Sequence, residues 1–297
     1  MSTVLEQLPE GAKVGIIRLR SLGDCVLTTP AIHLLKRYRP DLKLAVVVED
    51  RFAAVFRGNP DVDAVLSPAM GELTMWGPRL VINFHGGTRS MWLTALSLAG
   101  RRAGFQHYAA QGIYNVQMPR AQAVFGVERR VHTAEHLASG VFYLGVPVGE
   151  VPRARLFARA GVAAERPYAV IHPAASATDK SWSAAGFRAV AEHLRELEPV
   201  FIGGPGDDLS AFAGFRTVVG APLEETMTLL AGASLFVGND SGPAHMAAAL
   251  GVKQVVIFGP SDAETWAPWR VRAEVVNGRG SMGNVTVEAV LAAVDRL

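Results

Sequence analysis

The sequence predicts an α/β protein made of two Rossmann-like domains, and three observations lead to this fold class. Short apolar runs rich in Val and Ile recur along all 297 residues with little polar alternation, which is typical of strands buried on both faces of a parallel sheet. Segments with helical spacing lie between these runs, as in right-handed strand–helix–strand units. A stretch rich in proline and glycine, Val146–Pro167, interrupts the pattern near the middle of the chain.

This stretch is the predicted linker between the two domains. We therefore expect one domain over residues 1–150 and a second over residues 151–297, with two parallel sheets facing each other across a cleft. The last helix is a candidate to pack back on the first domain. Ligands of open parallel sheets bind at the carboxyl ends of the strands, so we expect the functional residues there.

The elements follow in order along the chain. The predicted strands are Lys13–Leu19, Leu42–Glu49, Leu80–Phe84 and Asn115–Met118 in the first half, and Tyr168–Ile171, Val200–Ile202, Leu235–Val237, Gln254–Phe258 and Ala273–Val276 in the second. One helix is expected after Ser183. Another should run from Ser241 to Leu250, with Gly251 as its C-terminal cap, and a last one should begin near Thr286.

Composition excludes several classes of protein. With 49% hydrophobic residues, the chain has enough apolar material to offset the entropy of folding, which excludes intrinsic disorder. The single cysteine, Cys25, cannot form an internal disulfide, so we expect a packing residue in a cytoplasmic protein. No apolar run reaches the ~20 residues of a membrane-spanning helix, and the first residues do not resemble a signal peptide.

The charge is small and unevenly distributed. A net charge of +2 does not indicate nucleic acid as a partner. Residues 1–150 hold 16 Lys and Arg against 12 Asp and Glu, a balance of +4, which leaves −2 for residues 151–297. Either this difference is chance, or the first half faces an anionic partner.

The first candidate site is the turn after the first strand, where Gly23 and Asp24 precede a helical pattern. A glycine there permits close approach of a ligand, and the free N–H groups of the next helix attract anions. Asp24 is either a helix cap or a general base at the end of a strand. The dinucleotide motif G-x-G-x-x-G is absent from this turn, and no P-loop motif occurs in the chain.

The second candidate site follows the strand that ends near His172. Small residues, Ser176 among them, leave space for a bulky ligand, and Lys180 precedes a helix. A lysine beside a helix N-terminus suits a phosphate group, because its charge adds to that of the helix dipole. The alternative is an ordinary solvated lysine in a loop.

The third candidate site gives the strongest local signal. Asp240, Ser241 and Gly242 follow an apolar strand directly, and Pro243 stands near the first helical turn, where its missing N–H costs nothing. The exposed N–H groups after Ser241 would bind an anion. His245 is either a ligand contact in the first helical turn or a packing residue.

Other features are weaker. Asp207 and Asp208 follow a Gly-rich turn and could reach a ribose. His132 and His136 are four residues apart and could share a metal ion, but a solvated helix face explains this spacing better. No cluster of His, Cys and Asp has the spacing of metal ligands, so we expect no metal site.

In this order, the three clusters resemble glycosyltransferase family 9, the ADP-heptose:lipopolysaccharide heptosyltransferases. The resemblance extends from Lys13 to about Leu297. The segments that carry it are Ile17–Asp24 with Thr28–Ala31, Lys180–Trp182, Asn239–Gly251, Phe258–Pro260 and Trp266–Pro268.

The resemblance implies a GT-B fold, with an acceptor-binding first domain and a nucleotide-sugar-binding second domain. It implies metal-independent transfer of a heptose or related sugar, with inversion, from an ADP-sugar to a lipopolysaccharide core-type acceptor. This acceptor would be an anionic or lipid-linked saccharide. No cofactor is implied, because the ADP-sugar is a substrate. Such an enzyme would be cytoplasmic, with peripheral contact to the inner membrane, and would not bind nucleic acid.

The family's site residues carry over position by position. Asp24 would be the general base for the acceptor hydroxyl, and Lys180 would neutralise charge on the departing diphosphate. The implied donor-binding residues are Gly23, Ser176, Lys180, Asp240, Ser241, Gly242 and His245. We add Arg18, Arg20 and Arg89 as candidate acceptor contacts, because they lie in the basic half near predicted strand ends.

Two alternatives belong to other function classes. A nucleotide-sugar epimerase of the same two-domain architecture would need no acceptor. A non-catalytic protein that binds nucleotide-sugars is disfavoured by the presence of both Asp24 and Lys180, because binding alone requires no base.

Overall fold

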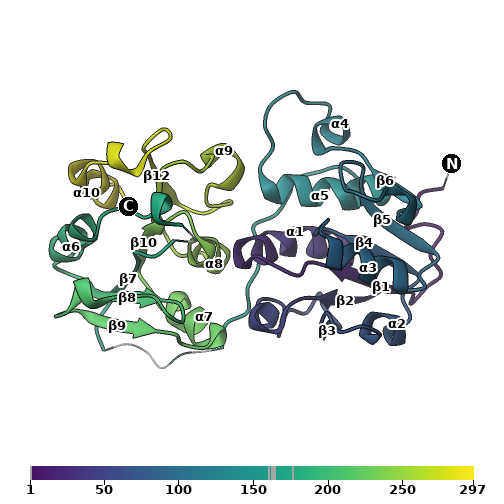
Figure 1. The fold of residues 1–297 in the computed structure, drawn as a ribbon, viewed down its shortest axis with the longest axis horizontal. Helices are drawn as coiled ribbons and strands as arrows, with labels where there is room; N and C mark the ends of the chain where they lie inside the picture. Colours follow the sequence, from purple (N-terminus) through teal and green to yellow (C-terminus); the bar gives the residue numbers. More distant parts are fainter. Residues whose placement is uncertain (1, 160, 162–164, 176) are drawn as a thin grey trace. The chain divides into compact units, whose positions relative to one another are not determined.

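The computed structural model describes residues 2–159, 161, 165–175 and 177–297, which form two compact units (Figure 1). The first unit ends at Phe157 and the second begins at Ala158. This boundary lies after the predicted one because Arg155 still belongs to the first unit. Its backbone N–H donates to Thr29 Oγ1 at 2.9 Å, and its guanidinium lies 3.1 Å from the Asp61 carboxylate.

The first unit contains a six-stranded parallel sheet in the order β3-β2-β1-β4-β5-β6. Its strands are β1 (Lys13–Ile17), β2 (Lys43–Val47), β3 (Ala64–Leu66), β4 (Leu80–Asn83), β5 (Arg101–Phe105) and β6 (Val116–Met118). The predicted strands of this half are confirmed. Both β3 and β5 escaped prediction, because β3 is only half-buried and β5 opens with two arginines.

Helices of the first unit pack in two groups. They are α1 (Leu22–Tyr38), α2 (Glu72–Trp76), α3 (Thr88–Leu96), α4 (Ala121–Phe125) and α5 (Thr133–Leu144), with short 3-10 turns at η1 (Asp50–Val55) and η2 (Gln111–Ile113). Helix α1 packs along α5. Leu73 of α2 and Leu93 of α3 join a separate apolar cluster with Ile17 and Val81 of the sheet. Gly15 makes this possible, because a Cβ there would come within 2.6 Å of Leu73.

The second unit repeats the architecture. Its parallel sheet has the order β12-β11-β10-β7-β8-β9, which counted within the unit is again 3-2-1-4-5-6. The strands are β7 (Tyr168–His172), β8 (Glu198–Gly203), β9 (Arg216–Val219), β10 (Leu235–Asn239), β11 (Gln254–Phe258) and β12 (Ala273–Asn277). The helices are α6 (Ala184–His193), α7 (Leu223–Ala231), α8 (Gly242–Leu250), α9 (Ala263–Trp266) and α10 (Val287–Asp295), with turns η3 (Thr178–Lys180), η4 (Ser210–Phe212) and η5 (Met282–Asn284).

The helix ends predicted in this half are confirmed. Ser183 caps α6 by accepting from the Gly186 N–H at 3.1 Å, and Thr286 caps α10 by accepting from the Ala289 N–H at 3.2 Å. Gly251 ends α8 with a φ of +82°, a left-handed conformation that favours glycine. Helix α10 packs on α6, β11 and β12 of its own unit.

Strand order determines where a ligand-binding crevice can form at the edge of each sheet. In the first unit β1 lies beside β4, and the chain leaves these two strands toward opposite edges of the sheet. The same holds for β7 and β10 in the second unit. A crevice forms outside the carboxyl ends of two such strands. Among the described residues, no helix is both long enough and apolar enough to span a bilayer.

Candidate active site

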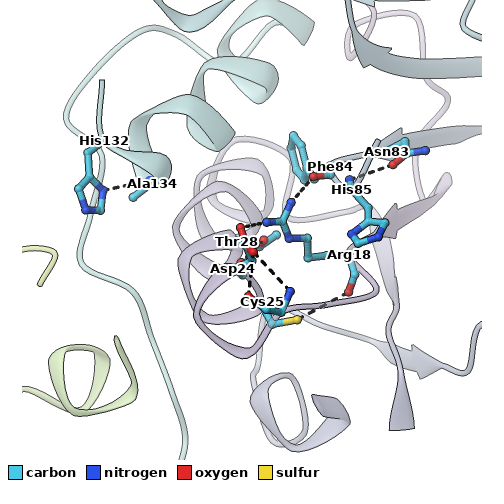
Figure 2. A network of polar contacts seen from close by, with 10 residues as sticks. Arg18, Asp24, Cys25, Thr28, Asn83, Phe84, His85, His132 and Ala134 are labelled. Carbon is cyan, nitrogen blue, oxygen red and sulfur yellow. Dashed lines mark hydrogen bonds and ion pairs between the residues drawn. The ribbon is translucent and has the colours of Figure 1, made fainter. Parts of the chain in front are cut away.

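The first site lies at the carboxyl ends of β1 and β4 (Figure 2). Asp24 stands in the first turn of α1, and its Oδ1 accepts from the guanidinium of Arg18. Its Oδ2 accepts from the Ser21 hydroxyl at 2.9 Å and from the Ser21 N–H at 3.3 Å. Asp24 therefore caps α1 as one half of a capping box with Ser21, which confirms the helix-cap interpretation. The carboxylate is also 20% exposed, which leaves it open to a ligand.

Arg18 lies beneath this carboxylate and is only 8% exposed. Its guanidinium donates to the Phe84 carbonyl at the end of β4 as well as to Asp24 (Figure 2). Burial lowers the pKa of Arg18, although an arginine keeps its charge in proteins. The Arg18 Nε atom has no hydrogen-bond partner within the described part of the chain. Arg18 thus acts on Asp24 and on the end of β4 from inside the unit.

Sequence reasoning missed His85, which follows β4. The His85 N–H donates to Asn83 Oδ1 at 2.9 Å, which holds the loop after β4 (Figure 2). Burial, together with the charges of Arg18 and Arg20, lowers the pKa of His85. The imidazole is therefore neutral near pH 7. Its position directly after an apolar strand was the signal that could have identified it.

The histidine pair His132 and His136 proves to be structural. His132 caps α5, because its Nδ1 accepts from the Ala134 N–H at 3.1 Å. The His136 ring stacks on Phe105 with ring centroids 4.2 Å apart, and burial lowers its pKa to about 4. The expected solvated helix face was wrong, because His132 is buried and the His136 ring packs on an aromatic side chain. Within the described ranges, no group of three or more His, Cys, Asp or Glu could hold a metal ion.

Cys25 is a packing residue, as predicted. It is fully buried in α1, and its thiol donates to the Arg18 carbonyl at 3.7 Å. Burial raises the pKa of the thiol to about 12, so the reactive thiolate is scarce at neutral pH. Gly23 beside it is buried in the first turn of α1.

The second site lies at the carboxyl ends of β7 and β10. Asn239 joins the two loops there: its Nδ2 donates to the Pro173 carbonyl at 2.7 Å, and its Oδ1 accepts from the Trp182 N–H at 3.1 Å. His172 Nδ1 lies 3.1 Å from the hydroxyl of Ser241. Burial lowers the pKa of His172 to about 4, so a neutral imidazole faces this hydroxyl.

Asp240, in the third candidate site, interacts electrostatically with Lys180 of the second. Burial raises the pKa of Asp240, while a hydrogen bond from Ser261 and the charge of Lys180 oppose the shift. Lys180, in η3, therefore lies within electrostatic range of Asp240. His245 Nε2 is 3.9 Å from Asp240 Oδ1, and its ring is 6.2 Å from that of Trp266. Ser176, a predicted donor contact, lies outside the described residues.

Helix α8 begins at this point with Gly242, and Ser241 occupies the N-cap position. In the described residues no side chain caps α8, whereas Ser183 and Thr286 cap α6 and α10. The N-terminus of α8 thus keeps N–H groups without a side-chain partner, directly after Asp240, on which the charge of Lys180 acts. This combination suits a diphosphate.

The remaining predicted contacts are dispersed. Arg20 is exposed, and Arg89 donates to the Pro68 carbonyl at 3.0 Å from the first turn of α3. Asp207 Oδ2 accepts from the Gly204 N–H at 2.7 Å, and Asp208 Oδ1 accepts from the Ser210 N–H at 2.8 Å. Both carboxylates therefore stabilise their own loop.

Comparisons with known proteins agree with this arrangement. The family model described as glycosyltransferase family 9 (heptosyltransferase) matches residues 79–289. Lipopolysaccharide heptosyltransferase 3 of Escherichia coli is 26% identical over 290 residues, which cover 84% of this chain and 84% of that protein.

Solved structures show the same fold. A glycosyltransferase family 9 structure from Veillonella parvula has a TM-score of 0.84 at 19% identity and covers 96% of each chain. The E. coli ADP-heptose lps heptosyltransferase II has a TM-score of 0.79 at 19% identity, covering 96% of this chain and 98% of its own. The chain thus has the GT-B fold that the sequence resemblance implied.

Proposed function

Because this chain belongs to glycosyltransferase family 9, the heptosyltransferase family, we propose that it transfers a heptose or related sugar from an ADP-sugar to a hydroxyl group of a lipopolysaccharide core-type acceptor. Two relatives support both substrates, since one is a lipopolysaccharide heptosyltransferase and the other an ADP-heptose heptosyltransferase. The single observation that carries the proposal is that the chain holds both a partly exposed, ion-paired carboxylate at Asp24 and an α8 N-terminus without a side-chain cap, whose neighbour Asp240 lies within electrostatic range of Lys180.

The second unit would bind the donor. The N–H groups at Ser241 and Gly242 would hold the diphosphate, and Lys180 would add a full positive charge. The neutral His172 fixes the Ser241 hydroxyl at the start of this helix. Asp240 directly precedes the N-cap of this helix and His245 lies in its first turn, where the two side chains would hold the sugar or the nucleoside.

The first unit would bind the acceptor. Asp24 would take the proton of the acceptor hydroxyl as its oxygen forms a bond to the anomeric carbon, while the bond from that carbon to the diphosphate breaks. Attack opposite the leaving ADP would invert the configuration. An ion pair with a permanently charged guanidinium requires an ionised carboxylate, which is the form that accepts a proton. Arg18 would therefore position the base rather than contact the acceptor, which leaves Arg20 and Arg89 as candidate contacts.

No metal ion is needed in this proposal, because Lys180 and the α8 N-terminus would meet the charge that develops on the departing ADP. This ADP-sugar is consumed as a substrate, so no cofactor is proposed. An anionic acceptor agrees with the balance of +4 in residues 1–150.

Thermal shift with nucleotide-sugars tests the donor, because a ligand stabilises the protein according to its concentration over its dissociation constant. We expect ADP-heptose to raise the melting temperature more than UDP- or GDP-sugars do. A preference for UDP-sugars would overturn the proposed donor. The reaction itself is tested by incubating the protein with donor alone and with donor plus core saccharide. Conversion of the donor without acceptor would favour an epimerase.

A further inference from the structure

Tyr108, in the loop after β5, carries a hydroxyl group that the rest of the described chain does not use. Its backbone N–H donates to the Phe105 carbonyl at 3.0 Å, and its carbonyl accepts from the side chain of Gln111. The hydroxyl, in contrast, makes no hydrogen bond within the described residues. A half-buried hydroxyl without a partner costs free energy, so contact with a ligand is the role that explains it.

The ring that carries this hydroxyl is held from two directions. The rings of Phe105 and Tyr108 meet edge to face, with centroids 5.7 Å apart and planes at 81°. His107 makes a second contact of this kind, with centroids 4.8 Å apart and planes at 76°. Such pairs stabilise a single orientation of the ring. The hydroxyl is therefore pre-organised, which lowers the entropic cost of binding a ligand.

Gly86 brings Tyr108 to the first site. A Cβ at Gly86 would come within 2.4 Å of the Tyr108 ring, so the ring lies directly against the loop that follows β4. This loop also contains His85, which lies in the network of Arg18 and Asp24 (Figure 2). The charge of Arg18 lowers the pKa of Tyr108, although burial outweighs this effect. Tyr108 therefore belongs to the group of side chains around the Arg18–Asp24 ion pair.

His85 offers a complementary group at the same place. A hydrogen bond to the backbone of Arg20 engages one nitrogen of its ring, while burial lowers its pKa and keeps the ring neutral. The other nitrogen of a neutral imidazole is a hydrogen-bond acceptor. Burial raises the pKa of Tyr108, so its phenol keeps the proton and can donate. The site thus combines an uncharged donor and an uncharged acceptor beside the carboxylate of Asp24.

We propose that Tyr108 and His85 bind a second hydroxyl group of the acceptor sugar, next to the hydroxyl that Asp24 would deprotonate. A sugar hydroxyl both donates and accepts hydrogen bonds, so it satisfies a phenol and a neutral imidazole together. A fully ionised phosphate offers no hydrogen to the imidazole and binds best to positive charge. The acceptor therefore presents a pair of hydroxyls here, and its anionic groups bind elsewhere.

The role given to Asp24 in this assignment rests on the proposed function, whereas saccharide binding by Tyr108 and His85 does not. Tyr108→Phe is the decisive variant, because it removes the hydroxyl and keeps the ring. Titration calorimetry with a de-acylated lipopolysaccharide core saccharide measures binding without transfer. We expect the Kd for this saccharide to rise roughly five- to tenfold. The melting temperature and the affinity for ADP-sugar should not change, since no protein group loses a partner.

Tyr114→Phe is the matched control. The Tyr114 hydroxyl accepts from Asn83 Nδ2 at 3.1 Å, and the residue is only 2% exposed. Its removal should lower the melting temperature and leave the Kd for the saccharide unchanged. Asn83 stays in place in this variant, because the same amide also donates to Thr94 Oγ1 at 3.0 Å.

Mono-deoxy analogues of the acceptor sugar test which group Tyr108 contacts. One analogue that keeps the attacked hydroxyl should bind the wild type roughly five- to tenfold more weakly than the parent saccharide does. Tyr108→Phe should bind this analogue and the parent equally well, because the variant has already lost the contact. Losses that add for every analogue would overturn the proposal. A folded Tyr108→Phe protein with a Kd within twofold of the wild type would also overturn it.

Binding and transfer fail separately in these experiments. A wild-type protein that binds the saccharide but transfers no sugar to it would contradict the proposed function and leave the hydroxyl subsite in place. A wild-type protein that transfers sugar, with an unchanged Kd in Tyr108→Phe, would overturn the subsite alone.

Discussion

The carboxylate of Asp24 forms an ion pair with the buried guanidinium of Arg18, six residues earlier in the chain. The same carboxylate closes the capping box of α1 with Ser21. Both of its oxygens are thus held by the protein before any ligand arrives, which fixes the orientation that a general base needs. Capping and catalysis are compatible here, because one carboxylate can accept several hydrogen bonds.

Asp24→Asn tests the proposed base. The amide keeps the shape but cannot take a proton, so sugar transfer should slow at least about a hundredfold while the affinity for ADP-sugar changes little. Because the substitution leaves the buried Arg18 without its counter-ion, the free energy of unfolding should also fall by roughly 2–3 kcal/mol. Steady-state kinetics and denaturant unfolding measure the two effects separately.

Ser21→Ala is the matched control for this variant. It removes the hydroxyl that donates to Asp24 but keeps the carboxylate and its ion pair. Turnover should stay within several-fold of the wild type. A folded Asp24→Asn protein with near-normal turnover would leave Asp24 as a helix cap alone.

Lys180→Ala tests the stabilisation of the leaving group. If Lys180 meets charge that develops as the sugar–diphosphate bond breaks, kcat should fall more than the KM for the donor rises. Asp179→Ala, the exposed neighbour in η3, should leave both constants nearly unchanged. An effect on KM alone would make Lys180 a ground-state contact.

Chelation tests the role of metal ions. Within the described part of the chain, no set of His, Cys, Asp and Glu is placed to hold a metal ion. Under the proposed function Lys180 and the α8 N-terminus meet the charge of the departing ADP, so activity should persist in excess EDTA. Loss of activity that Mg²⁺ or Mn²⁺ specifically restores would contradict the proposal that Lys180 and the α8 N-terminus neutralise the negative charge of the departing ADP.

Stability should depend on pH through His172. Burial lowers its pKa to about 4, whereas an unfolded histidine titrates near pH 6.5. Between these values the unfolded chain binds more protons, so the free energy of unfolding falls as the pH falls. Below pH 4 the full pKa shift of His172 lowers the free energy of unfolding by about 3 kcal/mol. Chemical unfolding at several pH values should show a smaller loss of the free energy of unfolding in His172→Gln than in the wild type.

How much of the fold the sequence predicts depends on the position of each strand. Central strands such as β7 and β11 are buried throughout, so their apolar runs were recognisable. Edge strand β9 is largely exposed, and β5 places Gly104 against the Tyr114 ring instead of a large apolar side chain. These segments lack a long apolar run that would predict a strand. They form strands because they pair in register with neighbouring strands.

The site was partly predictable for a related reason. Asp24, Lys180 and Asp240 were identified because each follows an apolar strand closely. The inward direction of the Arg18 side chain could not be predicted from the sequence, because a residue at a strand end can point either to solvent or beneath the loop. The contact between His172 and Ser241 joins residues 69 positions apart, and only the adjacency of β7 and β10 brings them together.

The repeated strand order has an evolutionary consequence. Both units carry their candidate site residues after the first and fourth strands of the same topology, so the chain consists of two compact units with the same strand order, each with its own sheet. Under the proposed function, one module would select the acceptor and the other the nucleotide-sugar. Recombination near Phe157 could then exchange one specificity while the other is inherited intact. Proteins of such a lineage can gain specificity for a new acceptor and keep their specificity for the same donor.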